Sequence, residues 1–209
     1  FSAGGMHGCK VIDEKTFLIY ITPEDEPPIN PSPWFAFRLK PKQSAEISVR
    51  LQYAEYDHRY HPKLSEDFKS WRRLSSDEIV KQKGANVEIK LSLSGKPVYI
   101  SAQELLDNQS YDNWMNTISS LTGAPITTIG KSSNQRDIKM LYSPASEKTK
   151  KTILLVGRQH PPEVPGALAM RSFVTTLMLN EKTANQFRKK FTIVAVPNMN
   201  PDGVERGHW

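Results

Sequence analysis

The hydrophobic period changes once along the chain, near residue 102. Before that point, segments such as KTFLIYIT and NVEIKLSLS place an apolar residue at every second position, which is the spacing of strands with one solvated face. After it, apolar strands alternate with amphipathic helices, an order typical of a mostly parallel α/β sheet. We therefore predict two domains, an antiparallel β-sandwich over residues 1–101 and an α/β domain over residues 102–209.

Composition narrows the possible partners and compartments. The chain has 209 residues and a net charge of +6, but its basic residues form short, scattered groups, which favour a solvated surface over a nucleic-acid-binding face. No segment approaches the roughly 18 apolar residues of a membrane span. The single cysteine, Cys9, excludes an internal disulfide. The chain begins FSAGGMHG without an initiator methionine, which favours a processed, exported bacterial protein, periplasmic or secreted, over a cytoplasmic one.

The stretch GRQHPPEVPG follows a predicted buried strand at Thr152–Val156 and precedes a predicted helix with Leu168, Phe173, Val174 and Leu177 near one face. His160 and Glu163 therefore lie where a strand passes into a helix, and the two intervening prolines stiffen the bend. Imidazole and carboxylate are habitual ligands of catalytic zinc, which uses three protein ligands and a water. Two of these ligands are visible here. The alternative is that His160 donates to a backbone carbonyl and Glu163 complements the helix dipole.

A second predicted buried strand, residues 191–197, also ends in a loop of unusual composition, VPNMNPDGVERGHW. Asn200, Pro201, Asp202 and Gly203 indicate a sharp, ordered turn. Because neighbouring parallel strands end at the same edge of a sheet, we expect this loop beside the His160 loop.

Together and in this order, GRQHPPE and PNMNPDG resemble the loop motifs of zinc carboxypeptidases of the carboxypeptidase A type, and in particular their cytosolic and bacterial branch. TTIGKSSNQRDIKML resembles the segment upstream of the first metal motif in that family. WFAFRL and HRYHPKLSEDFKSWRRL resemble the small sandwich domain that precedes the catalytic domain. The resemblance implies a β-sandwich followed by an incomplete, doubly wound mixed sheet of carboxypeptidase type, with one Zn²⁺ and with His160 and Glu163 as its first two ligands.

The implied activity is removal of C-terminal amino acids from peptides and proteins. In this family zinc polarises the scissile carbonyl and activates a water, and a glutamate is the general base. The resemblance places the third zinc ligand, the base and the substrate-gripping residues beyond residue 209, so we assign no catalytic or substrate-binding residue within the chain. His208 has no metal role in the family pattern. We expect the 209 residues alone to be inactive, and the incomplete sheet to invite self-association.

A different class of function also fits the first half of the chain. Its aromatic residues could form the surface of a β-sandwich binding module that recognises a glycan or a protein partner without catalysis, or they could form the core. The residues in question are Trp34, Phe35, Tyr53, Tyr56, Tyr60 and Trp71.

Overall fold

The structure is a computed structural model that describes residues 1–25, 34–55, 57–81, 86–146 and 151–208. It contains two compact units, Ala3–Leu105 and Leu106–Arg206, and Gly207 belongs to the first. Among the described residues, no helix has the length and apolarity that a membrane crossing requires.

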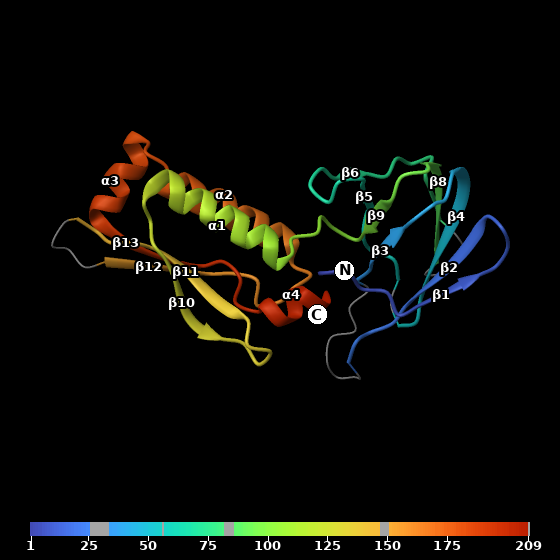
Figure 1. Ribbon diagram of the computed structural model, residues 1–209, viewed down its shortest axis with the longest axis horizontal. Coiled ribbons are helices and arrows are strands. Elements are labelled where there is room, and N and C mark those ends of the chain that lie inside the picture. Colours follow the sequence, from blue (N-terminus) through green and yellow to red (C-terminus); the bar gives the residue numbers. More distant parts are fainter. Residues whose placement is uncertain (26–33, 56, 82–85, 147–150, 209) are drawn as a thin grey trace. The chain divides into compact units, whose positions relative to one another are not determined.

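The first unit contains two sheets, drawn in blue to green in Figure 1. In spatial order, one sheet consists of β1 (Gly8–Val11), β2 (Thr16–Ile21), β4 (Ser44–Tyr53), β8 (Val87–Ser94) and β7 (Ile79–Lys81). The other consists of β3 (Ala36–Leu39), β9 (Val98–Ser101), β5 (Lys63–Ser65) and β6 (Arg72–Arg73).

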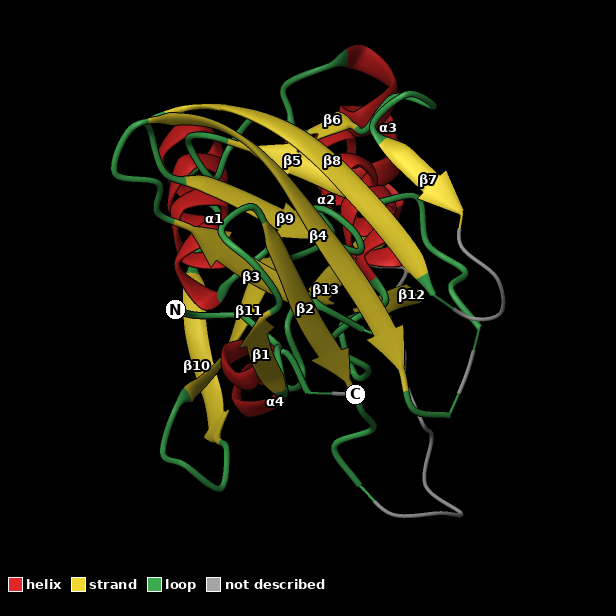
Figure 2. Ribbon diagram, turned by 90° about the vertical axis from the view of Figure 1, so that its right-hand side faces the viewer, coloured by secondary structure: helices red, strands yellow, loops and turns green. Residues whose placement is uncertain are grey.

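The alternating pattern of the sequence corresponds to alternating burial in these strands. In β8, Ile89, Leu91 and Leu93 are buried, and the residues between them are exposed. The predicted antiparallel pairing is wrong in one place, because β2 and β4 run parallel. The reason is the path of the chain: between β2 and β4 it passes through β3 in the other sheet and returns, so the two neighbours point the same way. Figure 2 shows β2 and β4 side by side.

The described residues of the second unit form one sheet and the helices α1 to α4 (Figure 1). The strands, in spatial order, are β10 (Ile126–Lys131), β11 (Asp137–Ser143), β13 (Phe191–Val196) and β12 (Lys151–Val156). The helices are α1 (Asn108–Thr122), α2 (Val164–Met178), α3 (Lys182–Lys190) and α4 (Pro201–Arg206). Within this sheet, the β12 and β13 pair is parallel and the other described pairs are antiparallel, so the sheet is mixed and the expectation of a mostly parallel sheet is wrong. A short turn joins β10 to β11, and such a connection makes an antiparallel hairpin.

Helix α1 is capped at both ends. The Asp107 side chain accepts a hydrogen bond from the Ser110 amide at 2.8 Å, and Gly123 ends the helix in the left-handed conformation with φ 73°. Its buried face includes Trp114, whose indole N–H donates to the Thr175 hydroxyl of α2 at 2.9 Å. Figure 1 shows α1 and α2 side by side along one face of the sheet.

Strand β12 departs from the expectation of a buried strand. It has one hydrogen-bonded neighbour, β13, and lies at the edge of the described sheet. Its side chains at Leu154 and Val156 are exposed, Leu154 by 63%. Phe173 of α2, predicted on the packed face, is exposed as well, whereas Val174 and Leu177 are buried. The apolar side chains of Leu154 and Val156 thus form part of a surface that no described residue covers.

Candidate functional site

The first site loop connects β12 to α2. After Val156 the chain turns tightly, and the Glu163 amide donates to the His160 carbonyl at 3.2 Å. Glu163 is the residue that precedes α2, but its side chain makes no capping hydrogen bond to the described helix. Instead, its Oε1 lies 3.1 Å from His160 Nδ1. The predicted pair therefore comes together, and both side chains are accessible, with exposures of 62% and 55%.

The second site loop follows β13. The predicted sharp turn is in fact the start of a short helix, α4, with Pro201 as its first residue. The Asn200 side chain accepts a hydrogen bond from the Gly203 amide at 2.9 Å, as a residue at a helix N-terminus does. Asparagine is favoured just before a helix and proline at its first position. The sequence Asn200–Pro201 therefore already indicated that a helix starts here.

The two loops are bonded to each other. Because β12 and β13 are parallel neighbours, both loops leave the same edge of the sheet, as predicted. The Met199 amide donates to the Gly157 carbonyl at 2.9 Å, and the Asn200 amide donates to the Arg158 carbonyl at 3.2 Å. Gly203 allows a close approach, since a Cβ atom there would lie 2.5 Å from Cγ of Pro161. The second loop therefore supports the first.

Asp202 attaches the β10–β11 hairpin to the second loop. Its carboxylate accepts hydrogen bonds from the Ser132 hydroxyl at 2.8 Å, the Asn134 amide at 2.9 Å and the Arg136 guanidinium at 2.7 Å. Desolvation raises the pKa of Asp202, but these hydrogen bonds and the charge of Arg136 outweigh it, so the pKa lies below its ordinary value. The segment TTIGKSSNQRDIKML, which contains these three donors, thus holds the second site loop in place.

Arg158 is a residue of the first loop that the sequence analysis did not select. It is buried, with 6% exposure, and its φ of 56° lies in the left-handed region. Its side chain donates to the Pro161 carbonyl and to the Tyr111 hydroxyl. An arginine after a strand reads from sequence as a solvated charge, and only the folded chain reveals these contacts.

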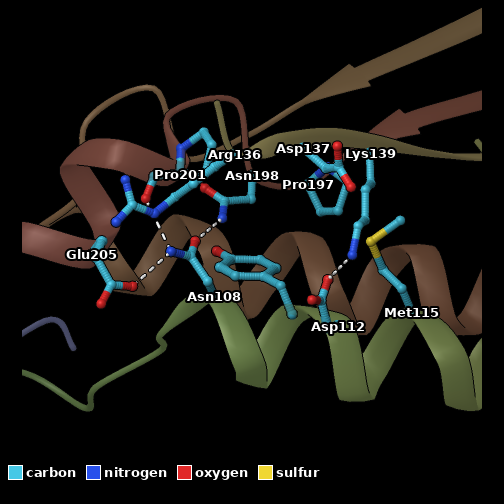
Figure 3. A pocket seen from close by; sticks show the side chains of 11 residues that line it. Asn108, Asp112, Met115, Arg136, Asp137, Lys139, Pro197, Asn198, Pro201 and Glu205 are labelled. Atoms are coloured by element: carbon cyan, nitrogen blue, oxygen red, sulfur yellow. Dashed lines mark hydrogen bonds and ion pairs between the residues drawn. The ribbon is translucent and has the colours of Figure 1, made fainter. Parts of the chain in front are cut away.

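A cavity of about 310 Å³ lies between α1, β11 and the second loop. Figure 3 shows that its polar side chains bond mostly to each other: Lys139 pairs with Asp112 at 2.7 Å, and the Asn198 amide donates to Asn108 Oδ1 at 2.8 Å. Asn108 in turn donates to the Pro201 carbonyl at 3.0 Å. The hydrogen bonds of Asn108 around this cavity attach the second loop to α1. His160 and Glu163 are not among its lining residues.

His208 lies in the first unit, and so do His58 and His61 of the HRYH segment. His208 Nε2 is 2.8 Å from Asp25 Oδ2, His58 bonds the Tyr53 hydroxyl at 2.6 Å, and His61 bonds the Leu74 carbonyl at 2.7 Å. Within the described ranges, no group of three or more His, Cys, Asp or Glu side chains could hold a metal ion.

The aromatic residues considered for a binding surface are mainly core residues. Trp34, Phe35 and Tyr53 are buried, and Tyr60 and Trp71 are half-buried. Tyr56 lies outside the described residues. This burial does not favour a glycan-binding or protein-binding platform.

Comparisons with known proteins agree with the geometry of the loops. Residues 111–209 match the zinc carboxypeptidase family model. Cytosolic carboxypeptidase 2 of Danio rerio is 33% identical over 65 residues, which cover 31% of this chain and 9% of the relative. Cytosolic carboxypeptidase 6 of Mus musculus is 29% identical over 86 residues, covering 39% of this chain and 16% of the relative.

Solved structures show the same fold over the whole chain. A metallo-carboxypeptidase from Burkholderia cenocepacia superimposes with a TM-score of 0.84 at 19% identity, and one from Pseudomonas aeruginosa with 0.74 at 19% identity. Each covers 100% of this chain, which spans 57% and 56% of theirs, respectively. Residues 111–209 thus match a zinc carboxypeptidase domain, and the chain as a whole shares the fold of these bacterial metallo-carboxypeptidases.

Proposed function

We propose that the protein acts as a zinc-dependent metallocarboxypeptidase that removes C-terminal amino acids from peptides or proteins. The observation that supports this most directly is the 3.1 Å approach of His160 Nδ1 to Glu163 Oε1. The pair lies after the carboxyl end of β12, within the region that matches the family model. Ligands of α/β proteins bind at that edge of the sheet.

The donor pair fits a zinc ion in its chemistry and spacing. Zinc in catalytic sites prefers imidazole nitrogen and carboxylate oxygen at about 2.0 to 2.2 Å, so two such ligands in a tetrahedron are roughly 3.3 to 3.6 Å apart. The observed separation of 3.1 Å requires only a small outward movement of either side chain. Both side chains are accessible, which allows an ion to enter and a peptide to approach.

In this proposal His160 and Glu163 are two of the three protein ligands of one Zn²⁺ per chain. When bound, zinc supplies a Lewis acid for the scissile carbonyl and lowers the pKa of its water. Pro161 and Pro162 hold the two ligand side chains on one stiff turn, which limits the conformational entropy lost on binding. The third ligand and the general base are expected outside these 209 residues, so we expect the 209 residues alone to be inactive.

We also propose that the two sheets of the first unit pack as a β-sandwich, with a domain boundary near residues 101 and 102. Both sheets bury apolar side chains, such as Ile89 of β8 and Ile100 of β9, and this burial supports the proposal. For the second unit we propose a doubly wound sheet of carboxypeptidase type. The mixed strand order supports the carboxypeptidase type, and α1 and α2 provide the helical layer on one of the two faces that such a fold covers.

The exposed edge of the second sheet supports a proposal about association. Leu154 and Val156 of β12 and Phe173 of α2 are exposed apolar side chains, and β12 has a hydrogen-bonding edge without a partner among the described strands. Such edges pair with other chains unless charge or cover prevents it. We propose that the 209-residue chain self-associates through β12.

Zinc titration of the 209-residue chain tests the metal role. The ring nitrogen signals of His160 should shift on addition of Zn²⁺, measured by ¹H–¹⁵N NMR. His160→Ala should abolish the specific response, and Glu163→Gln should weaken it at least about tenfold because the neutral amide is a poorer ligand. His61→Gln, a histidine change in the other unit, is the control and should leave the response at His160 unchanged. Equal zinc binding in all four proteins would refute the assignment.

Peptide hydrolysis tests the activity. The natural protein that contains these residues should release C-terminal amino acids from unblocked peptides, lose that activity with a chelator and regain it with Zn²⁺. His160→Ala should remove it even with zinc present. The 209-residue chain alone should give no release above background. Release by this chain at the rate of the natural protein would show that residues beyond position 209 are not needed.

A further inference from the structure

Arg158 has a backbone conformation that its residue type does not favour. Its φ of 56° lies in the left-handed region, where non-glycine residues are uncommon and strained. A residue stays in such a conformation when its surroundings determine it. For Arg158, both the backbone and the side chain are fixed by neighbours.

The backbone of Arg158 is fixed by the second loop. Its carbonyl accepts a hydrogen bond from the Asn200 amide at 3.2 Å, and the preceding carbonyl of Gly157 accepts one from the Met199 amide at 2.9 Å. These two bonds fix the exit from β12. The left-handed conformation then turns the Arg158 side chain inward, where it is 6% exposed.

The side chain of Arg158 connects the site turn to helix α1. Its Nε donates to the carbonyl of Pro161, and its Nη1 donates to the Tyr111 hydroxyl at 3.0 Å. The guanidinium carbon also lies 5.8 Å from the centre of the Tyr111 ring, within the range of a cation–π interaction. Tyr111 is buried on α1 and provides a rigid partner. Hydrogen bonds from a guanidinium are about twice as strong as those between neutral groups.

The bonded carbonyl lies between the two candidate ligands in the sequence. Pro161 follows His160 directly and precedes Glu163 by two residues, and the Glu163 amide donates back to the His160 carbonyl at 3.2 Å. Rotation of the Pro161 peptide would change the relative orientation of His160 and Glu163, and the bond from Arg158 opposes this rotation. We propose that Arg158 is the positioning residue of the His160 and Glu163 pair. This inference rests on the proposed zinc role of that pair, and it adds a residue that sets the ligand geometry without touching the ion.

Two variants of the 209-residue chain separate the side chain from the backbone. Arg158→Lys retains the charge, but a single ammonium does not reproduce the two-pronged contact. Arg158→Gly removes the side chain and relieves the left-handed backbone, so a loss of positioning in this variant is not a result of strain. The matched control is Arg188→Lys, because the Arg188 guanidinium also makes two hydrogen bonds, in its case to the backbone carbonyls of Leu177 and Leu179 at the other end of α2.

Two measurements are made on each protein. Without metal, amide hydrogen exchange of Glu163 reports opening of the turn, and we expect both Arg158 variants to exchange about tenfold faster than the wild type. With Zn²⁺, the His160 ring signals give an apparent dissociation constant, which we expect to rise about tenfold, as for loss of an outer-shell partner of a ligand. Arg188→Lys should leave both quantities within about twofold of the wild type.

The outcomes distinguish this inference from the proposed function. If Arg158→Gly has the same Glu163 exchange rate and the same zinc affinity as the wild type, the positioning role is overturned. It is also overturned if Arg188→Lys changes both quantities as much as the Arg158 variants do. Faster exchange with unchanged zinc affinity would overturn it too, because the turn would then open without consequence for the ligands. A wild-type His160 ring that does not respond to Zn²⁺ would contradict the proposed function instead, and the exchange of Glu163 would then decide whether Arg158 fixes the turn.

Discussion

The side-chain amide of Asn200 donates a hydrogen bond to the backbone carbonyl of Gln159, 3.1 Å away, and so connects two loops that are 41 residues apart in the sequence. Gln159 is the residue immediately before His160. The same Asn200 side chain accepts a hydrogen bond from the Gly203 amide at the start of α4. One asparagine therefore starts a helix and supports the turn that presents His160 and Glu163.

Asn200 is expected to contribute to stability through both of its bonds. Asn200→Asp retains the acceptor for the Gly203 amide and loses the donor to Gln159, which should cost about 1 kcal/mol of unfolding free energy. Asn200→Ala loses both and should cost about 2 kcal/mol. Urea unfolding followed at the indole signal of Trp114 measures this in the second unit. Asn113→Ala, at an exposed helical position, is the control and should change the free energy by less than about 0.5 kcal/mol. Equal stability of the two Asn200 variants would show that the bond to Gln159 contributes nothing.

Gly203 is expected to tolerate no side chain. An added Cβ would lie 2.5 Å from Pro161 Cγ and 2.7 Å from Asn200 Nδ2, so Gly203→Ala must push the two loops apart. We expect a loss of about 1 to 3 kcal/mol in unfolding free energy, the usual cost of overpacking. Gly166→Ala is a matched control in α2, since a Cβ there meets nothing within 4 Å. It should stabilise the chain by up to about 1 kcal/mol through helix propensity. Calorimetric melting of both variants measures these changes in stability. A Gly203→Ala protein as stable as the wild type would contradict the close packing of the two loops.

Asp202 is expected to make the second unit acid-sensitive. Because hydrogen bonds from Asn134, Arg136 and Ser132 lower its pKa in the folded chain despite desolvation, the folded state binds this proton less readily than the unfolded state. Its stabilisation is therefore complete above the ordinary aspartate pKa of about 3.9 and is lost as the pH falls through the lower, folded value. Urea midpoints measured from pH 6 down to pH 3 should fall for the wild type.

Two variants identify Asp202 as the source of that slope. Asp202→Asn should have a lower midpoint at pH 6 and a flatter decline, because the titrating group is gone. Arg136→Met removes one of the donors to the carboxylate and should flatten the decline only partly. An Asp202→Asn protein whose midpoint declines as steeply as that of the wild type would place the acid sensitivity elsewhere.

The sequence was informative about local structure and about the pair of candidate ligands. Alternating apolar residues predicted β2 and β8, and the strand-to-helix position of His160 and Glu163 led to a pair that lies together. These features depend on neighbouring residues, whose periodicity and turn chemistry are visible in the chain.

What the sequence did not reveal depends on long-range packing. The parallel pairing of β2 with β4 follows from a crossover through another sheet, and the inward path of Arg158 follows from bonds to residues far away in the chain. Periodicity reports which residues are apolar but not which strand is at an edge, so Leu154 was predicted to be buried and is exposed.

The exposed edge strand leads to the last prediction, which tests the proposed self-association. Leu154 projects from β12 with 63% exposure, and a lysine there would place a charge on the free edge, a common protection against edge pairing. We expect Leu154→Lys to reduce the self-association constant of the 209-residue chain at least about tenfold, measured by sedimentation velocity over a range of concentrations. Leu121→Lys is the matched control, since Leu121 is similarly exposed but lies on α1, and it should associate like the wild type. Equal association of the three proteins would exclude β12 as the contact, whereas a monomeric wild type at all concentrations would refute the proposal of self-association itself.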